Sequence, residues 1–138
     1  DDSIAIHETI NRLGLKDHVL TPGYASDNDL AYFYKYAEMY VFPSINEGFG
    51  LPVLEAFHHQ IPVIVSDNTC LPEVGGDATL CFDPFNVKEI SQKIKELIET
   101  PGLRQELILK GTERLKLFSW EKNTRELIKT FQAAINKN

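Results

Sequence analysis

Short apolar runs alternate with amphipathic segments along the first 82 residues of this chain. Continuous apolar runs that are bounded by proline, glycine or polar residues are typical of strands buried in a sheet. Four such runs predict strands at residues 18–21, 39–42, 62–66 and 79–82. Apolar residues at helical spacing predict helices at residues 28–37 and 51–59, and a helical turn at 71–74. This alternation indicates a Rossmann-like α/β fold, a parallel sheet with helices on both faces.

The two ends of the chain depart from the alternation. Residues 4–13 have a helical pattern that ends at Gly14, a typical C-terminal cap, and no strand comes before them. After residue 82 the pattern predicts helices alone, at residues 87–99, around Leu103 and Leu107, and at residues 120–136 with Ser119 as the N-cap. We therefore expect a chain that begins in the middle of an α/β repeat, with its first strands missing, and that closes in C-terminal helices.

The composition is that of one globular domain, which we expect to span residues 1–138. Hydrophobic residues make up 43% of the chain and charged residues 25%. The net charge of −6 argues against a nucleic-acid-binding surface. No apolar run approaches the ~18 residues that span a bilayer, and no basic amphipathic stretch indicates membrane contact.

The residues that commonly bind metals are scattered in this sequence. Cys70 and Cys81 lack the spacing of a metal site, and without a signal peptide they are typical of reduced thiols in a cytoplasmic protein. His58 and His59 are adjacent, so on a helix their side chains point about 100° apart. We expect neither a metal site nor a cofactor.

A loop with two glycines follows the second predicted strand. Gly48 and Gly50 come just before the predicted helix at residues 51–59. Glycine permits backbone conformations that other residues avoid, and it lets a ligand approach the main chain closely. N–H groups at a helix N-terminus favour phosphate, because the helix dipole lies behind them. The N–H groups of Phe49, Gly50 and Leu51 are therefore candidate donors to a phosphate or to sugar hydroxyls.

Two carboxylates flank these glycines. Glu47 lies in the loop, and Glu55 lies about one turn into the helix, where side chains lean toward the N-terminus. Both can line one pocket and accept hydrogen bonds from the hydroxyls of a sugar or a ribose. We expect Phe49 to pack inward between the glycines. The alternative is that Glu55 is a solvated helix residue and Glu47 an acidic group at the helix N-terminus.

Six short motifs follow one another along the chain: Pro43-Ser44, Glu47-Gly48-Phe49-Gly50-Leu51-Pro52, Glu55-Ala56, Pro62-Val63-Ile64, Leu71-Pro72-Glu73-Val74 and Phe118-Ser119-Trp120-Glu121. In this order they resemble the retaining GT-B glycosyltransferases of group 1, also called family 4. The resemblance runs from about Gly14 to Ala134. Its most specific part is the pair of glutamates eight residues apart around Gly-Phe-Gly-Leu-Pro.

The resemblance implies the C-terminal, donor-binding half of an enzyme whose active site lies between two Rossmann-like domains. It maps Glu47 to the catalytic position that contacts the donor sugar, and Glu55 to the position that holds the ribose hydroxyls. It maps Tyr24 to the surroundings of the base. The backbone that lies against the sugar and the diphosphate maps to Gly48, Phe49, Gly50 and Leu51.

The sequence departs from the family pattern in two places. Relatives neutralise the diphosphate with an Arg and a Lys on strands that would precede Asp1, and the chain offers no substitute for the pair. Relatives also end the motif helix with a small-x-Gly sequence, whereas this chain has His58-His59-Gln60-Ile61. The second departure removes the glycine that usually adopts a left-handed conformation at the helix end.

Three hypotheses for function remain open. The leading one is the donor half of a glycosyltransferase that moves a sugar from a nucleoside diphosphate to an acceptor with retention, in the cytoplasm or at the cytoplasmic face of a membrane. The second is a non-catalytic nucleotide-sugar-binding fragment or subunit that needs a partner domain for activity. The third is a flavodoxin-like regulatory domain, which the chain resembles less because no pair of aspartates follows a strand.

The expected partners follow from the leading hypothesis. A nucleotide-sugar donor would bind to this chain, while the acceptor would bind to a missing N-terminal domain. The isolated chain would then be inactive as an enzyme. An incomplete sheet would also expose an edge strand, through which copies of the chain can associate. The sequence does not identify the donor sugar, its base or the acceptor.

Overall fold

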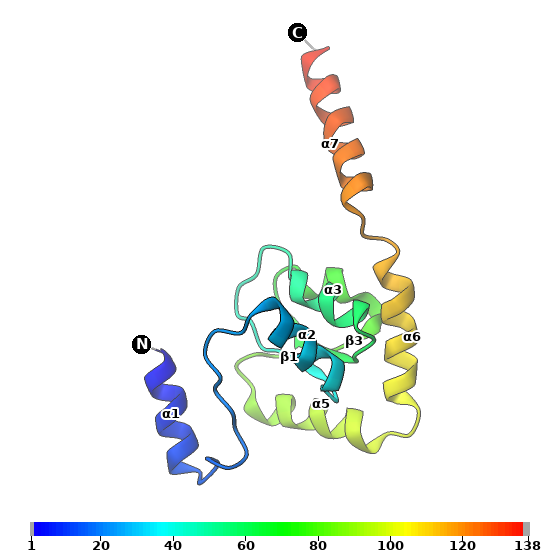
Figure 1. The fold of residues 1–138 in the computed structure, drawn as a ribbon. Coiled ribbons are helices and arrows are strands. Elements are labelled where there is room, and N and C mark those ends of the chain that lie inside the picture. The colour runs from blue at the N-terminus through cyan, green and yellow to red at the C-terminus, as the bar shows by residue number, and fades with distance from the viewer. Residues whose placement is uncertain (1, 137–138) are drawn as a thin grey trace. The chain divides into compact units, whose positions relative to one another are not determined.

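A computed structural model describes residues 2–136 (Figure 1). Its Cα packing divides the chain into two units, Asp1–Tyr32 and Phe33–Asn138. Helix α2, Asp27–Tyr36, begins in the first unit and ends in the second. The second unit contains the sheet and the predicted site residues from Glu47 to Glu55, whereas Tyr24 belongs to the first unit.

The first unit holds helix α1, Asp2–Arg12, and the start of α2. Gly14 ends α1 as predicted: it has φ 67°, Leu15 N–H bonds to the Ile10 carbonyl at 2.9 Å, and Gly14 N–H bonds to the Asn11 carbonyl at 3.2 Å. This pair of bonds is the Schellman motif. The Ser26 hydroxyl accepts a bond from Asp29 N–H at 3.3 Å and caps α2.

The strand predicted at residues 18–21 is wrong. The N–H groups of His18 and Val19 both bond to the Leu15 carbonyl at 3.0 Å, so the backbone turns there. Leu20 is 87% exposed, and no strand pairs with this segment in the described part of the unit. A short, partly β-branched segment forms a strand only beside a partner strand, so the local pattern was not sufficient to predict one.

The second unit is built on a parallel sheet. Within residues 2–136 it has three strands, β1 (Tyr40–Phe42), β2 (Val63–Ser66) and β3 (Thr79–Phe82), in the order β1-β2-β3. Ile64 lies between Val41 and Leu80 in the register. β2 is buried along its whole length, as its continuous apolar run predicts. The strands predicted at residues 39–42, 62–66 and 79–82 are therefore confirmed. Each observed end lies within one residue of the predicted end.

Helices cover both faces of this sheet, as the alternation predicts (Figure 1). On one face α3 (Leu51–His58) and α4 (Leu71–Gly75) pack against Val63 and Val65. On the other face α5 (Val87–Glu99) and α6 (Leu103–Leu115) pack against Ile64 and Phe82. A short 3-10 helix, Gly76–Ala78, links α4 to β3. These two apolar clusters fix the position of the helices around the carboxyl ends of the strands.

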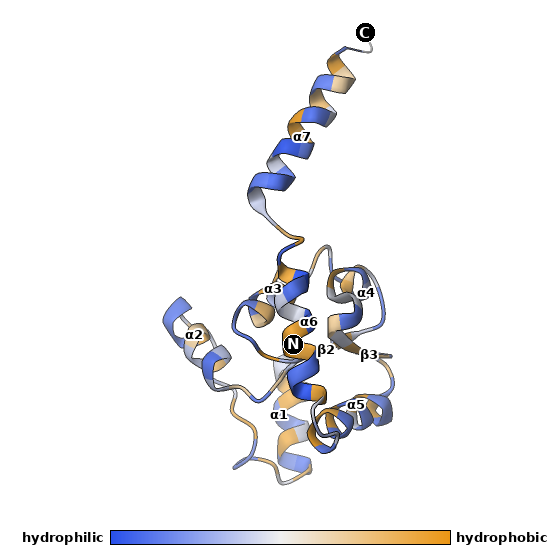
Figure 2. Ribbon diagram, turned by 90° about the vertical axis from the view of Figure 1, so that its right-hand side faces the viewer, coloured by the Kyte–Doolittle hydropathy of each residue, from blue (hydrophilic) through white to orange (hydrophobic). Residues whose placement is uncertain are grey.

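The last helix, α7 (Trp120–Ile135), begins at Ser119, whose hydroxyl accepts a bond from Lys122 N–H at 3.2 Å. This confirms the predicted N-cap. No residue of α7 is buried in the described chain, and apolar residues are visible along it in Figure 2. None of the helices in residues 2–136 combines the length and apolar character needed to cross a bilayer.

The end of α3 makes a left-handed turn although the glycine that the resemblance leads one to expect there is absent. Gln60 has φ 57°. Ile61 N–H bonds to the Ala56 carbonyl and Gln60 N–H to the Phe57 carbonyl, both at 3.0 Å, which is the same Schellman pattern as at Gly14. A left-handed residue with a Cβ costs about 1–2 kcal/mol. The fold therefore tolerates strain at Gln60 to end α3 before β2.

Replacing Gln60 by glycine should stabilise the chain. Gln60→Gly removes the Cβ from a left-handed residue, so we expect the free energy of unfolding to rise by about 1 kcal/mol in urea titration. The same exchange at Gln92, an exposed residue inside α5, should lower it by about 1 kcal/mol. A loss of stability at both positions would contradict the conformation described for Gln60.

Candidate functional site

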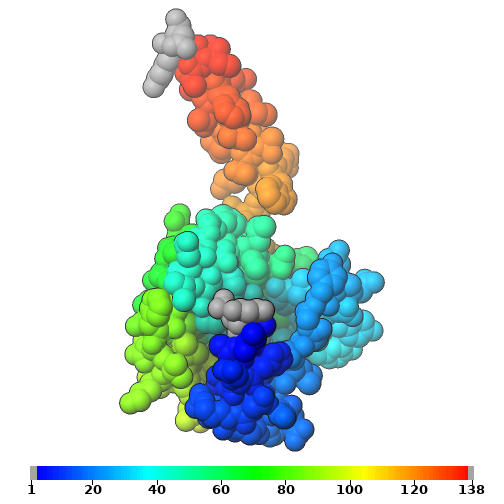
Figure 3. Space-filling model, turned by 90° about the vertical axis from the view of Figure 1, so that its left-hand side faces the viewer, coloured from blue at the N-terminus to red at the C-terminus, as the bar shows by residue number. Residues whose placement is uncertain are grey.

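The loop of residues 43–50 joins the carboxyl end of β1 to the first turn of α3. The carboxyl ends of parallel strands are where ligands bind in open α/β sheets. The loop and the start of α3 reach the surface, as the turquoise atoms of Figure 3 show. Its own hydrogen bonds are few: the Ser44 hydroxyl donates to the Asn46 carbonyl at 3.3 Å. Other elements must therefore hold the loop in place.

Gly50 starts α3 from a left-handed conformation. Its φ is 89°, and a Cβ built on it would lie 2.7 Å from the Leu71 Cδ2 atom of α4. Only glycine fits both the dihedral angle and the contact. Gly48 differs, because its φ lies outside the left-handed range and nothing lies within 4 Å of an added Cβ. Of the two glycines, only Gly50 therefore adopts a conformation that other residues avoid.

Unbonded N–H groups cluster at the start of α3. No side chain caps this helix. Among the hydrogen bonds of the described residues, none has the N–H of Phe49, Gly50 or Leu51 as its donor. Pro52 follows in the first turn, where a missing N–H costs nothing. The helix therefore presents the donors that the sequence predicts, at the positive end of its dipole.

Two side chains from the loop after β2 hold the loop after β1. The Asn68 amide donates to the Ile45 carbonyl at 2.9 Å, and the Cys70 thiol donates to the Glu47 carbonyl at 3.4 Å. Sequence reasoning missed both residues, and it treated Cys70 as an isolated thiol. The signal was that both follow β2, whose carboxyl end lies beside that of β1 in a parallel sheet.

Glu55 has a specific partner inside the protein. The Tyr34 hydroxyl, from α2, donates to the Glu55 Oε2 atom at 3.0 Å. The Tyr34 ring stacks on His59 at 5.1 Å between centroids and lies tilted against Tyr40 at 5.8 Å. Glu55 itself is exposed. It is therefore not a freely solvated helix residue, because a buried tyrosine fixes one of its two oxygens.

Both predicted carboxylates act on one neighbouring residue. Burial raises the pKa of Tyr40 from 10.0 to about 12, and the negative charges of Glu55 and Glu47 contribute in the same direction. Burial, followed by the hydrogen bond to Glu55, also raises the pKa of Tyr34 above its ordinary value. Glu55 is connected to Tyr40 through Tyr34, whose hydroxyl bonds to Glu55 and whose ring packs against the Tyr40 ring.

The predicted site also includes two aromatic residues, Phe49 and Tyr24. Phe49 is 44% exposed, and its ring contacts Phe118 edge to face at 5.9 Å, so the expectation that it packs inward is wrong. The loop needs that contact because its own backbone has few bonds. Tyr24 is 93% exposed and belongs to the first unit, and its role near a base stays a prediction.

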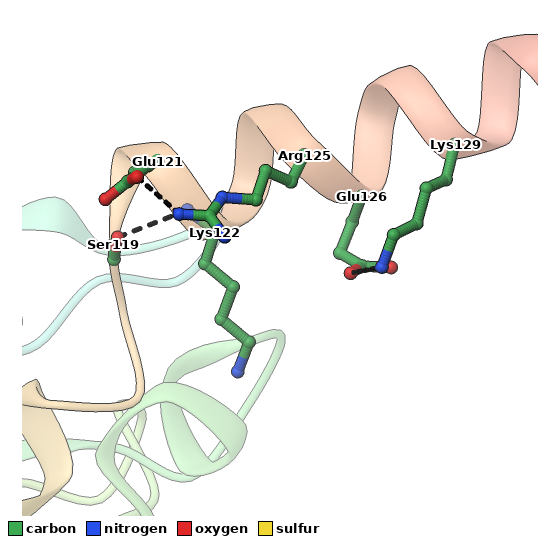
Figure 4. Close-up of a pocket in the computed structure, with 6 residues that line it drawn as sticks. All are labelled: Ser119, Glu121, Lys122, Arg125, Glu126 and Lys129. Atoms are coloured by element: carbon green, nitrogen blue, oxygen red, sulfur yellow. Dashed lines mark hydrogen bonds and ion pairs between the residues drawn. The ribbon is translucent and has the colours of Figure 1, made fainter.

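A shallow hollow on α7 offers a different group of charged residues (Figure 4). All lie on the first turns of one helix, and they pair with each other: Glu126 with Lys129 at 2.8 Å, and Glu121 with Arg125. Such pairs at helical spacing are ordinary on a solvated face. Four of the charged residues that line the hollow are thus already paired, unlike the N–H groups at the start of α3.

Comparison with known proteins agrees with this geometry. The family model of glycosyl transferases group 1 matches residues 5–114. The O-antigen chain mannosyltransferase B of Escherichia coli is 43% identical over 110 residues, which are 80% of this chain. The chain spans only 29% of that relative's length.

Two solved structures are similar to the chain. The sucrose-phosphate synthase of Thermosynechococcus elongatus matches with a TM-score of 0.83 and 26% identity, over 96% of this chain and 34% of that protein. The C-terminal domain of a group 1 glycosyl transferase from Francisella tularensis matches with a TM-score of 0.74 and 26% identity, over 85% of this chain and 62% of that domain. The chain thus has the GT-B type of α/β fold that the sequence predicts.

Alanine substitutions at Gly50 and Gly48 should distinguish a position that requires glycine from one that has room for a side chain. We expect Gly50→Ala to lower the free energy of unfolding by about 2 kcal/mol, because the new methyl group meets Leu71 and the φ angle is left-handed. Gly48→Ala is the matched control and should change it by less than about 0.5 kcal/mol. Equal losses in chemical denaturation would contradict the geometry of this turn.

The ionisation of Tyr40 should report on both glutamates. We expect its pKa, followed by carbon NMR of labelled tyrosines, to fall in Glu47→Gln and in Glu55→Gln, since each exchange removes a negative charge. Glu73→Gln, on α4, should leave it unchanged. Because the folded pKa exceeds the unfolded one, the stability of the chain should fall as pH rises from about 10 to about 12. If the pKa of Tyr40 were the same in both variants as in the unmodified chain, neither glutamate would lie close enough to Tyr40 to affect it.

Proposed function

The chain belongs to the glycosyl transferases group 1 family, and from this premise we propose that it binds the nucleoside-diphosphate sugar that serves as donor. One observation carries the proposal: α3 starts with unbonded N–H groups, and Glu47 and Glu55 lie before and after that start. A ligand with both phosphates and hydroxyls needs donors and acceptors in that combination.

The diphosphate would lie against the start of α3. The N–H groups of Gly50 and Leu51 are free to donate to phosphate oxygens, and the helix dipole favours the negative charge. The net charge of −6 repels an anionic ligand at long range. The local dipoles at the start of α3 must therefore overcome this repulsion. Cations that neutralise the diphosphate would come from the Arg and Lys that the family places on preceding strands.

The two glutamates would divide the hydroxyl groups between them. Glu55 would accept hydrogen bonds from the ribose, because it lies one turn inside α3, beyond the phosphate-binding N–H groups. Glu47 would orient the donor sugar, since it lies in the loop on the other side of Gly50. Preorganised dipoles of this kind stabilise a departing diphosphate in the transition state.

We further propose mannose as the donor sugar, because the similar protein from Escherichia coli is named a mannosyltransferase. Transfer would keep the anomeric configuration, as in the family that the sequence resembles. The acceptor would bind to a second domain, since the chain spans 29% of that relative. In this proposal the chain supplies donor recognition and the second domain completes the active site.

A binding subunit without turnover is the second candidate. In this candidate the chain binds the nucleotide sugar, and transfer needs a partner domain. Adding the N-terminal domain of a related enzyme and measuring mannose transfer discriminates between the two. Transfer by the mixture would favour the enzyme half. Transfer by the chain alone would contradict the need for a second domain.

Removal of Glu55 should weaken nucleotide binding. In calorimetry with guanosine, uridine and adenosine diphosphates, we expect Glu55→Ala to reduce the affinity of the tightest one by about tenfold or more, since bonds to a charged acceptor are lost. Glu99→Ala, at the end of α5, is the matched control and should have no effect.

The Glu47 exchange tests the other half of the proposal. Glu47→Ala should reduce the affinity for a nucleoside-diphosphate sugar about tenfold and leave the affinity for the nucleoside diphosphate itself nearly unchanged. The proposed function would be wrong if none of the three diphosphates bound to the chain, or if the Glu55 variant bound them as tightly as the unmodified chain.

A further inference from the structure

We propose that Tyr34 is a positioning residue that fixes the carboxylate of Glu55 for the hydroxyls of the donor's ribose. The inference rests on the proposed function, and it adds a residue from outside every motif that carries the family resemblance. Tyr34 lies on α2, whereas the motif residues begin at Pro43. Its connection to the site is the bond from its hydroxyl to Glu55 Oε2, which is 3.0 Å long.

The tyrosine is held rigidly enough to act as a fixed donor. Its side chain is 6% exposed. The His59 ring stacks on it with an interplanar angle of 9°, and the Tyr40 ring packs against it at 58°. Ala56 and Phe57 of α3 belong to the same buried cluster. With the ring fixed among these neighbours, the direction of the hydroxyl is fixed too.

The bond to Tyr34 orders the Glu55 side chain, which the exposed surface of a helix would not do. A glutamate side chain has several rotatable bonds, and an exposed one samples many rotamers. The bond to Tyr34 selects conformers in which Oε2 turns toward the protein. A carboxylate has about four lone-pair sites. Oε1 and the remaining site of Oε2 therefore stay available to the hydroxyls of a ligand. The pair of vicinal hydroxyls on a ribose matches that remaining capacity.

The Tyr34 hydroxyl keeps its proton near neutral pH. Burial and the bond to Glu55 raise the pKa of Tyr34 above its ordinary value of 10.0. The Tyr34 hydroxyl is therefore a donor near neutral pH. The carboxylate is left as an acceptor for the ligand, as the recognition of hydroxyls requires.

The test compares two ligands that differ only in the ribose. Calorimetry uses the tightest binder among guanosine, uridine and adenosine diphosphates, together with its 2′,3′-dideoxy counterpart. We expect Tyr34→Phe, which keeps the ring and removes the hydroxyl, to lower the affinity for the ribose form about fivefold, the order expected when one side chain is no longer ordered before binding. The affinity for the dideoxy form should not change.

Two further variants make the comparison specific. In a Glu55→Ala background, adding Tyr34→Phe should have no further effect on either ligand, because the tyrosine acts only through that glutamate. Ile64→Val is the matched stability control: it lies on the opposite face of the sheet, it loses one buried methylene, and it should change neither affinity.

Each outcome bears on the inference. Equal losses for the ribose and dideoxy forms, or no loss for either, would overturn the positioning role while leaving the proposed function intact if Glu55→Ala still weakens binding. Binding of no diphosphate by the unmodified chain would overturn the proposed function and the inference with it. A loss confined to the ribose form, and absent in the Glu55→Ala background, is the result that the geometry predicts.

Discussion

The contact between Gly50 and Leu71 is the constraint on which the candidate site depends. α3 can start where it does only if the chain passes close to α4 in a left-handed conformation, and a Cβ at Gly50 would lie 2.7 Å from Leu71. That start leaves the N–H groups of Phe49 to Leu51 unbonded and sets the direction of the helix that carries Glu55. The donors and one acceptor are thus placed by a single packing contact.

The loop before this contact is held by groups from several elements instead of by its own backbone. Asn68 and Cys70 bond to two of its carbonyls from the loop after β2, and Phe118 contacts Phe49 from the segment before α7. Tyr34 reaches Glu55 from α2. A rigid site on an exposed loop requires such support, because loops otherwise sample many conformations.

The fold was largely predictable because its signals are local. The buried run of β2, the cap at Ser119 and the glycine at position 14 each specify structure within a few residues. The strand expected at residues 18–21 failed because β-structure needs a partner strand that a local pattern cannot reveal. At Gln60 the backbone adopts a left-handed conformation without a glycine, and the Schellman hydrogen bonds that end α3 accompany it.

The candidate site was predictable only in part for the same reason. The motif identifies Glu47, Glu55 and the helix start, because they lie within nine residues of each other. Tyr34 is 21 positions before Glu55, and Asn68 is 23 after Ile45, so no spacing rule connects them. Only the packing of α2 and of the loop after β2 brings these side chains to the loop.

The most direct measurement is an NMR titration of the isotope-labelled chain with a nucleoside-diphosphate mannose, following the backbone amides. If the start of α3 binds the diphosphate, the largest changes will be at Phe49, Gly50 and Leu51, with smaller changes around Glu47 and Glu55. Changes confined to other surfaces, such as the charged face of α7 between Ser119 and Lys129, would contradict the account.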